Sequence, residues 1–469
     1  MRGEANKPAA IALVSFLGER PVSRRIKARR SIAAGLLFPA ALFVSASLSA
    51  TELSALRIWD SPEYTRAVFE ISAPADYKVF HLDNPERIVV DVKRGTLAKG
   101  VANGLSGGGK SLVKSVRSGK PDNDTLRIVL DLGGKARPKS FLLAPAEHYS
   151  HRLVVDLFPS EKAKPEPQAK LTRKAIQADS RNVLIAIDAG HGGEDPGALG
   201  TSRGEHEKHL TLAVARALKS AIEQEPGMSA FLVRDGDYFI PLKRRYEIAR
   251  EKKADLFVSI HADASEDGGG SGASVFMLSR KGASSQAARM LAQRENQSDL
   301  VGGVSLDDRD SSLAAVLLDL SQGATLAASD QVANQVLASL KQVGSVHKRD
   351  VQRANFVVLR APDVPSILVE TAYITNPEDA KKLRDPEYRE SLAEAMLEGM
   401  RNYFRATPPP GSYFALKREQ PSQHVVSKGE TLAVIAQRHG VTLSALKTAN
   451  RLRDEQLREG DVLKLPTPS

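Results

Sequence analysis

The chain is 469 residues long, enough for about three domains, and its hydrophobic fraction of 42% favours packed cores over general disorder. The absence of cysteine excludes cysteine-based catalysis. A net charge of +10 favours acidic partners, either nucleic acid or an anionic polymer. No nucleic-acid recognition motif accompanies this charge, and we therefore expect no nucleic-acid partner.

Residues 1–50 have the order of a cleavable export signal. A basic stretch at 24–30 precedes the apolar run 31–44, and small residues follow at 45–50. An uncleaved membrane anchor is the alternative, but Pro39 interrupts the apolar run and the run is short for a membrane span. We therefore expect an exported protein without an integral membrane anchor. The arginine pairs leave the twin-arginine export route open.

Residues 51–160 carry one six-residue pattern four times: arginine, an apolar residue, valine, an apolar residue, an acid and an apolar residue. The copies are 66–71, 87–92, 127–132 and 152–157. Each copy has the length of a strand and is bounded by turn residues, which predicts a small β-sandwich. A charged, proline-bearing segment at 161–182 predicts a linker.

Three apolar runs within residues 183–405 each end on a polar side chain. The run 183–187 leads into a glycine-rich loop that contains His191, the run 255–260 ends on His261, and the run 366–369 ends on Glu370. Such runs predict buried strands of an α/β domain with a mostly parallel sheet. Because the carboxyl ends of parallel strands meet at one edge, we expect the three side chains to lie together.

Glu207 is a fourth candidate at this edge, because it opens an amphipathic helix whose apolar positions are Leu210, Val214, Leu218 and Ile222. A single histidine is more often a core or surface residue than a ligand. Two histidines, a carboxylate and one open position, however, make a catalytic zinc site. Serine catalysis is disfavoured, because no Gly-x-Ser-x-Gly turn occurs.

Residues 183–405 resemble the zinc-dependent N-acetylmuramoyl-L-alanine amidases of the periplasmic, cell-division type. The matching motifs are 188–198, 204–208, 259–264 and 370–377. The resemblance implies one zinc ion held by His191, Glu207 and His261, with Glu370 as the catalytic base. Two positions depart from the family pattern: Ala189 replaces a proline, and His209, which replaces an aspartate or asparagine, puts a third histidine near the metal.

The implied reaction is hydrolysis of the amide bond between N-acetylmuramic acid and L-alanine in peptidoglycan, which splits the septal wall and separates daughter cells. A basic residue near the developing oxyanion would help, and the sequence does not choose between Arg234, Arg245 and Lys208. Two alternatives stay open: a non-catalytic scaffold that binds peptidoglycan, and a zinc peptidase that cuts within the stem peptide.

Two flanking regions resemble the accessory domains of such amidases. Residues 51–160 resemble the AMIN domain, which localises these enzymes on peptidoglycan, although a generic β-sandwich with another partner is the alternative. A second linker at 406–422 is rich in proline. Residues 423–467, beginning with the motif 424–432, resemble the glycan-binding LysM module, with a strand, two short helices and a strand.

An insert at 280–345 separates the second and third of the predicted strands. It contains a helical segment at 287–295, a polar and glycine-rich stretch at 296–303, and a second helical stretch at 312–322. The resemblance implies that this insert covers the zinc until an activator protein of the LytM type removes it. Glu295 is our candidate for the side chain that occupies the open zinc position; a solvated Glu295 is the alternative.

Overall fold

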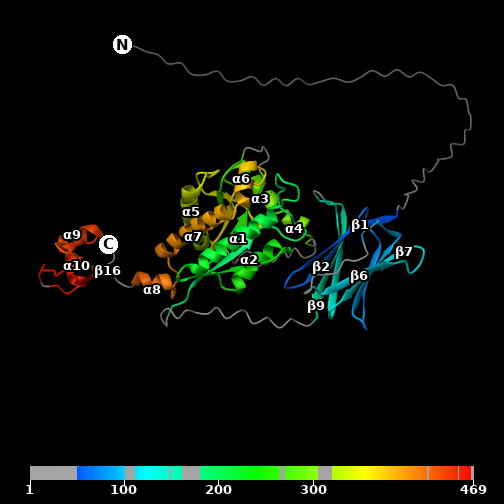
Figure 1. Ribbon diagram of the computed structural model, residues 1–469, viewed down its shortest axis with the longest axis horizontal. Helices are drawn as coiled ribbons and strands as arrows, with labels where there is room; N and C mark the ends of the chain where they lie inside the picture. Colours follow the sequence, from blue (N-terminus) through cyan, green and yellow to red (C-terminus); the bar gives the residue numbers. More distant parts are fainter. Residues whose placement is uncertain are drawn as a thin grey trace, which may run out of the picture. The chain divides into compact units, whose positions relative to one another are not determined.

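The computed structural model describes residues 50–99, 101, 111–146, 149–160, 180–264, 270–304, 319–419, 422–452 and 454–465. Nearly all of the predicted export segment, residues 161–179 of the first predicted linker and residues 305–318 of the insert lie outside these ranges. No helix among the described residues is long and apolar enough to cross a membrane. Figure 1 shows the chain coloured along its sequence and labels many of its helices and strands.

Residues 51–159 form a β-sandwich whose two sheets share one hydrophobic core. The first sheet has the order β5 (Gly95–Leu97), β1 (Thr51–Asp60), β2 (Thr65–Ile71), β9 (His151–Pro159) and β8 (Ala136–Leu143). The second has the order β3 (Tyr77–Leu82), β4 (Arg87–Lys93), β7 (Thr125–Leu132) and β6 (Val113–Gly119). The predicted β-sandwich is therefore confirmed.

The four copies of the repeated pattern are β2, β9, β4 and β7, and they form the antiparallel pairs β2–β9 and β4–β7. Alternate side chains point into the core, because strand side chains alternate between the two faces. The antiparallel register places the arginine of one copy opposite the acid of its partner, as in Arg66 opposite Asp156 and Arg127 opposite Asp91. The sandwich thus carries the same charge pattern on both outer faces.

The second domain is built around a mixed sheet. Its order is β11 (Met228–Leu232), β10 (Val183–Ala189), β12 (Leu256–His261), β15 (Ser366–Glu370), β13 (Ser274–Leu278) and β14 (Gln352–Ala354). Every pair in it is parallel except β13–β15, which is antiparallel. The central strands are apolar on both faces because helices cover both faces.

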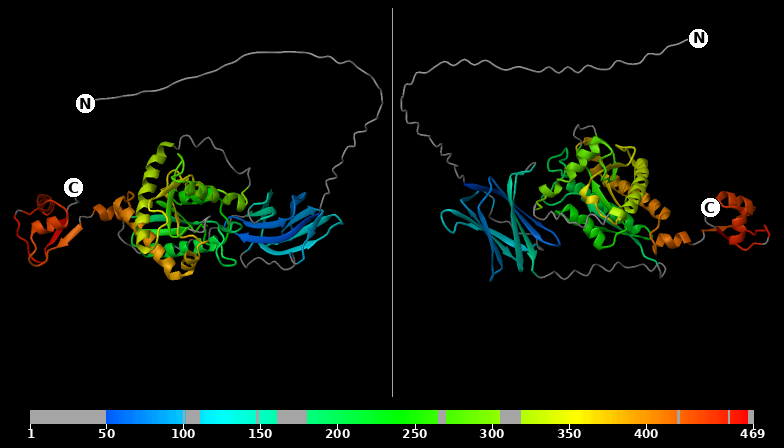
Figure 2. Two further views of the ribbon diagram at one scale, coloured as in Figure 1. Left: turned by 90° about the horizontal axis from the view of Figure 1, so that it is seen from above. Right: turned by 180° about the vertical axis from the view of Figure 1, so that it is seen from behind.

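One face of this sheet packs against α1 (Glu207–Gln224), α5 (Asp319–Val343) and α7 (Pro386–Ala406). The other face packs against α2 (Leu242–Glu251), α3 (Gln286–Glu295) and the short helix η3 (Val357–Leu359). Figure 2 shows helices on both sides of the sheet. The remaining helices are α4 (Ser298–Val301), α6 (Pro377–Arg384) and α8 (Tyr413–Glu419). The predicted α/β domain is confirmed.

The last domain has its own small core. It consists of β16 (Ser422–Val425), α9 (Leu432–Arg438), α10 (Leu443–Ala449) and β17 (Val462–Leu465), and its two strands pair antiparallel. Thr431 and Thr442 cap the two helices, and each accepts a hydrogen bond from a backbone N–H of the first turn. The predicted order of strand, two helices and strand is therefore present.

Candidate metal centre

The carboxyl ends of β10, β12 and β15 lie side by side, because β12 pairs in parallel with both neighbours. His261 ends β12 and lies directly opposite Glu370, which ends β15. His191 follows β10 by two residues and has a φ of 63°. This left-handed conformation costs about 1–3 kcal/mol in a residue other than glycine, and such strain is typical of functional sites.

Three of the predicted site residues come together here. Nε2 of His191 lies 3.1 Å from Oε2 of Glu207, and Nδ1 of His261 lies 3.2 Å from Oε1 of Glu207. All three side chains are buried. The two imidazole nitrogens have no hydrogen-bond partner among the described residues. Two unpartnered nitrogens and a carboxylate that face a common point fit a tetrahedral cation with one position left open.

Backbone groups fix the carboxylate of Glu207. Its Oε1 accepts a hydrogen bond from the N–H of Ala262 at 2.8 Å, and its Oε2 accepts one from Ala198 at 2.9 Å. Gly197 has a φ of 67°, and a Cβ atom there would lie 2.7 Å from Glu207 Oε2 and from His191 Cδ2. The glycine-rich loop therefore approaches the site more closely than a side chain would permit.

Asp195 orients His191, and the sequence did not single it out for this role. Its Oδ2 lies 2.8 Å from Nδ1 of His191, which leaves Nε2 facing Glu207. Asp195 also accepts hydrogen bonds from the backbone of Gly197 and from the hydroxyl of Ser298. Carboxylates in this position fix the tautomer and the ring orientation of metal-binding histidines. The only sequence signal for it was its place four residues after His191 in the same loop.

The charges of the site favour a cation. Burial lowers the pKa of His191, but the carboxylates of Asp195, Glu207 and Glu295 outweigh burial and raise the pKa well above 6.5. For the acid Glu207 burial has the opposite effect and raises the pKa, but the two imidazoles outweigh burial and hold the pKa of Glu207 well below its usual range. The carboxylate of Glu207 thus remains negative and attracts positive charge to the point that it faces.

Glu370 is fully buried beside this cluster. Its Oε2 accepts a hydrogen bond from the N–H of Asp263 at 3.0 Å, whereas its Oε1 has no partner among the described residues. Burial, together with the charges of Asp263, Glu207 and Glu295, raises its pKa well above 4.5. A carboxylate with one fixed and one unpartnered oxygen is suited to accept and return a proton.

The three basic candidates all stabilise the backbone around the site. Arg234 donates hydrogen bonds to the carbonyls of residues 189, 190, 208 and 236. Arg245 donates to Asp188 and to the carbonyls of residues 189, 191 and 240. Lys208 donates to Asp237 and to the carbonyl of Gly193. These hydrogen bonds stabilise the backbone of the site. They do not assign the role of oxyanion donor to any of the three residues.

His209 lies outside the cluster of potential ligands, although the sequence places it two residues after Glu207. Its ring instead lies 6.1 Å from that of His206. Residues two apart on a helix point in different directions, which explains the separation. The structure therefore does not add a third histidine to the pair formed by His191 and His261.

The helical insert reaches the site through Glu295, the last residue of α3. Oε2 of Glu295 lies 3.1 Å from Nδ1 of His261 and 3.5 Å from Nε2 of His191. These are the same two nitrogens that face Glu207. The side chain is buried, which rules out a solvated Glu295 in this structure, and burial raises its pKa to about 7 against the opposing effect of the imidazoles.

Arg294 adds a second contact between α3 and the site. Its Nη1 lies 2.7 Å and 2.8 Å from the two carboxylate oxygens of Asp263, and it also donates to the carbonyl of Ala264. Asp263 in turn holds Glu370 through its backbone N–H. Sequence reasoning missed this ion pair, because its partners come from segments that only the fold brings together.

Comparisons with known proteins identify three domains in the chain. The model of the Amidase_3 family, described as N-acetylmuramoyl-L-alanine amidase, matches residues 185–402. The AMIN domain model matches residues 55–157, and the LysM domain model matches residues 424–466. The three domains thus occur in the predicted order, and the LysM domain supports binding to peptidoglycan.

Curated relatives cover most of the chain. It is 40% identical over 378 residues to N-acetylmuramoyl-L-alanine amidase AmiC from Escherichia coli O6:H1, with 76% of this chain and 90% of the relative covered. It is 38% identical over 414 residues to AmiC from Neisseria meningitidis serogroup B, with 82% and 98% covered. The solved structure of AmiC2 from Nostoc punctiforme is 30% identical, with a TM-score of 0.35, and covers 48% of this chain and 99% of that chain.

Proposed function

Because this chain belongs to the family of N-acetylmuramoyl-L-alanine amidases, we propose that it is a zinc-dependent, autoinhibited member that acts in the periplasm at the division septum. Its substrate is the amide bond between N-acetylmuramic acid and L-alanine in peptidoglycan. The observation that carries the proposal is the convergence of two buried, unpartnered imidazole nitrogens on the carboxylate of Glu207.

His191, Glu207 and His261 would hold the zinc ion. When bound there, zinc supplies an activated water and polarises the carbonyl of the scissile amide. Oε1 of Glu370 accepts the proton of the attacking water and returns it to the leaving nitrogen, while the N–H of Asp263 holds Oε2 in place. Burial and the neighbouring carboxylates raise the pKa of Glu370 above 4.5, which makes its carboxylate a stronger base toward the proton of water.

Product analysis tests the reaction. Purified protein is incubated with isolated sacculi, and the soluble products are identified by mass spectrometry. We expect intact stem peptides that begin with L-alanine, together with glycan strands that have lost their peptides. Shortened peptides still attached to the glycan would instead indicate a peptidase, and binding without any product would indicate a scaffold.

Autoinhibition rests on the position of Glu295. Its carboxylate faces both imidazoles, and a carboxylate there is able to occupy the open metal position. Removal of α3 would free that position for water and substrate. We propose that a LytM-type activator displaces the insert, while the LysM module keeps the enzyme on its glycan substrate.

Two variants test the autoinhibition. Glu295→Ala, or deletion of residues 287–322, should raise hydrolysis of sacculi in the absence of any partner. Gln293→Ala is the matched control, because Gln293 is exposed on the same helix. A folded, zinc-loaded Glu295→Ala protein no more active than the parent would show that the insert does not block the site.

A further inference from the structure

The two outer faces of the AMIN sandwich carry the same ion pair in different surroundings. Arg66 binds Asp156 through two hydrogen bonds of 2.6 and 2.7 Å, and Arg127 binds Asp91 through two of 2.7 and 2.6 Å. The exposed fractions of the side chains are 7% and 7% in the first pair but 37% and 18% in the second. The outer face of the sheet that carries Arg66 and Asp156 is therefore covered, whereas the outer face with Arg127 and Asp91 is more open to solvent.

The end of α4 covers that face, and the AMIN and catalytic domains lie within one compact unit, Ser49–Ser469. Nη1 of Arg152 donates a hydrogen bond of 2.6 Å to the carbonyl of Val301, and Nη1 of Arg66 donates one to the carbonyl of Gly302. These carbonyls lie at the carboxyl end of α4, where backbone acceptors lack partners within the helix.

The backbone after α4 lies directly against the sheet. Gly303 has a φ of 81°, and a Cβ atom there would lie 3.0 Å from Cδ1 of Leu143 and 3.1 Å from Nη1 of Arg66. Val154, which points outward from β9, lies next to it and is 1% exposed. A side chain at residue 303 would therefore require the ends of the Leu143 and Arg66 side chains to move away.

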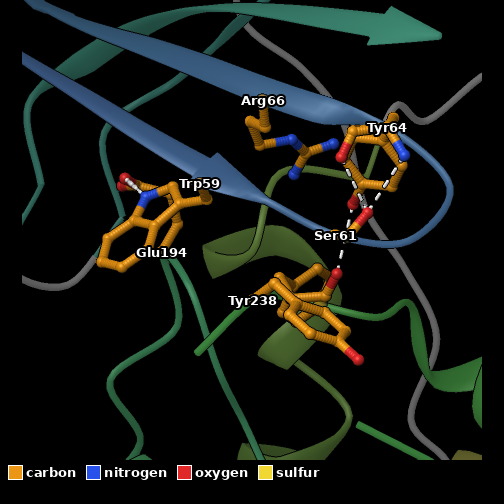
Figure 3. Close-up of a pocket in the computed structure, with 7 residues that line it drawn as sticks. Trp59, Ser61, Tyr64, Arg66, Glu194 and Tyr238 are labelled. Atoms are coloured by element: carbon orange, nitrogen blue, oxygen red, sulfur yellow. Dashed lines mark hydrogen bonds between the residues drawn. The ribbon is translucent and has the colours of Figure 1, made fainter. Parts of the chain in front are cut away.

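A second set of contacts lies next to the metal centre. Arg57 donates two hydrogen bonds of 2.8 and 3.0 Å to Glu194, and the indole N–H of Trp59 donates a third of 2.6 Å. Figure 3 shows Trp59 directed at Glu194 and the hydroxyl of Tyr64 directed toward the loop beside Tyr238. Glu194 directly precedes Asp195, which orients His191.

We propose that the AMIN docking face, formed by Arg57, Trp59, Arg66 and Arg152, binds the catalytic domain at Glu194 and α4 and thereby restrains the helix that carries Glu295. This inference rests on the autoinhibition proposed above. Only two residues separate α3 from α4, so a contact that fixes the end of α4 also limits the movement of α3. The AMIN domain thus acts as a clamp on the insert in addition to any wall binding.

The contact between the AMIN docking face and the catalytic domain includes an unfavourable element, so the two domains are able to separate. The side chain of Arg152 is fully buried, yet its Nε and Nη2 have no hydrogen-bond partner among the described residues. A buried guanidinium with unmet donors is unfavourable, and separation of the domains would return these donors to water. The clamp is therefore able to open when the insert is displaced.

The test uses the full chain and two matched variants. Arg152→Gln removes the charge that holds the carbonyl of Val301, whereas Arg87→Gln changes the arginine at the equivalent place of the other sheet. Two readouts are taken without activator: hydrogen exchange in residues 286–304, and hydrolysis of a soluble muropeptide, which avoids wall binding. We expect both to rise on the order of tenfold in Arg152→Gln and to stay at the parent level in Arg87→Gln.

The two readouts separate this inference from the proposed autoinhibition. If Glu295→Ala raises hydrolysis but Arg152→Gln changes neither readout, the clamp is wrong and the autoinhibition stands. If Arg152→Gln raises exchange in residues 286–304 and Glu295→Ala leaves hydrolysis unchanged, docking of the AMIN face stands and the insert does not inhibit. Equal effects of Arg152→Gln and Arg87→Gln would mean that both residues only stabilise the sandwich. The proposal that the AMIN domain restrains the insert would then be wrong.

Discussion

The active-site edge of the sheet and the α3–α4 insert both bring carboxylates to one point, but they hold them differently. His261 and Glu370 are fixed by strand register, and Glu207 is fixed by two backbone N–H groups. Glu295 reaches the same point from a ten-residue helix. Side-chain contacts hold the insert in place: Arg294 of α3 contacts Asp263, and Ser298 of α4 contacts Asp195.

This difference indicates which part of the centre is permanent. Displacement of His261 or Glu370 would require the central sheet to break, whereas displacement of Glu295 requires α3 to leave its packing on one face of the sheet and to lose a few buried polar contacts. Elements that move in regulation are drawn from the less stable parts of a structure. The strand ends therefore suit catalysis and the insert suits control.

The largest effect is expected at the strand ends. His261→Ala removes one of three potential ligands, and the remaining two no longer hold zinc in an open tetrahedral site. Bound metal, measured by elemental analysis, and hydrolysis should be lost together. His209→Ala is the matched control, because His209 lies outside the cluster, and it should retain both. Full activity of a metal-free His261→Ala protein would contradict the assignment.

The second prediction separates the base from the ligands. Glu370→Gln keeps the shape and the hydrogen bond to Asp263 but removes the proton acceptor. We expect zinc to be retained and the rate to fall by a factor on the order of 10² to 10⁴. Loss of zinc in this variant would make Glu370 a ligand, and the base would then have to be another group.

The third prediction addresses the insert. Arg294→Ala removes the ion pair with Asp263 that holds α3 over the site. Basal hydrolysis of a soluble muropeptide should rise by roughly tenfold, the size expected for a charge-assisted contact with a buried partner. Arg289→Ala, on the same helix but exposed, should have no effect. A rise of equal size in both variants would indicate a general loss of helix stability.

The strand ends were predictable from the sequence, whereas the contacts of the insert were not. A buried apolar run that ends on His261 or Glu370 is visible in the sequence, and parallel strands bring such ends together. The pairing of Arg294 with Asp263 joins segments 31 residues apart and depends on how α3 packs. The roles of Arg234 and Arg245 were equally hidden, because their partners are backbone carbonyls.

The smallest effect is expected far from both regions, in the LysM module. Hydrogen bonds from the backbone of Ser427 and the ring of His424, together with Arg438, lower the pKa of Glu430 from 4.5 to about 2. Because the folded pKa lies below the unfolded one, the stabilisation is complete above pH 4.5. It is lost as the pH falls toward about 2.

Glu430→Gln should therefore lower the melting temperature of the LysM module at pH 7, and the difference from the parent should shrink toward pH 2. Calorimetry of the full chain at several pH values measures this, and hydrolysis of a soluble muropeptide should stay at the parent level. A difference that persists unchanged at low pH would mean that Glu430 acts through packing and not through its charge. A change in hydrolysis would mean that the LysM module influences the catalytic site. Neither the residues at the strand ends nor those of the insert account for such an influence.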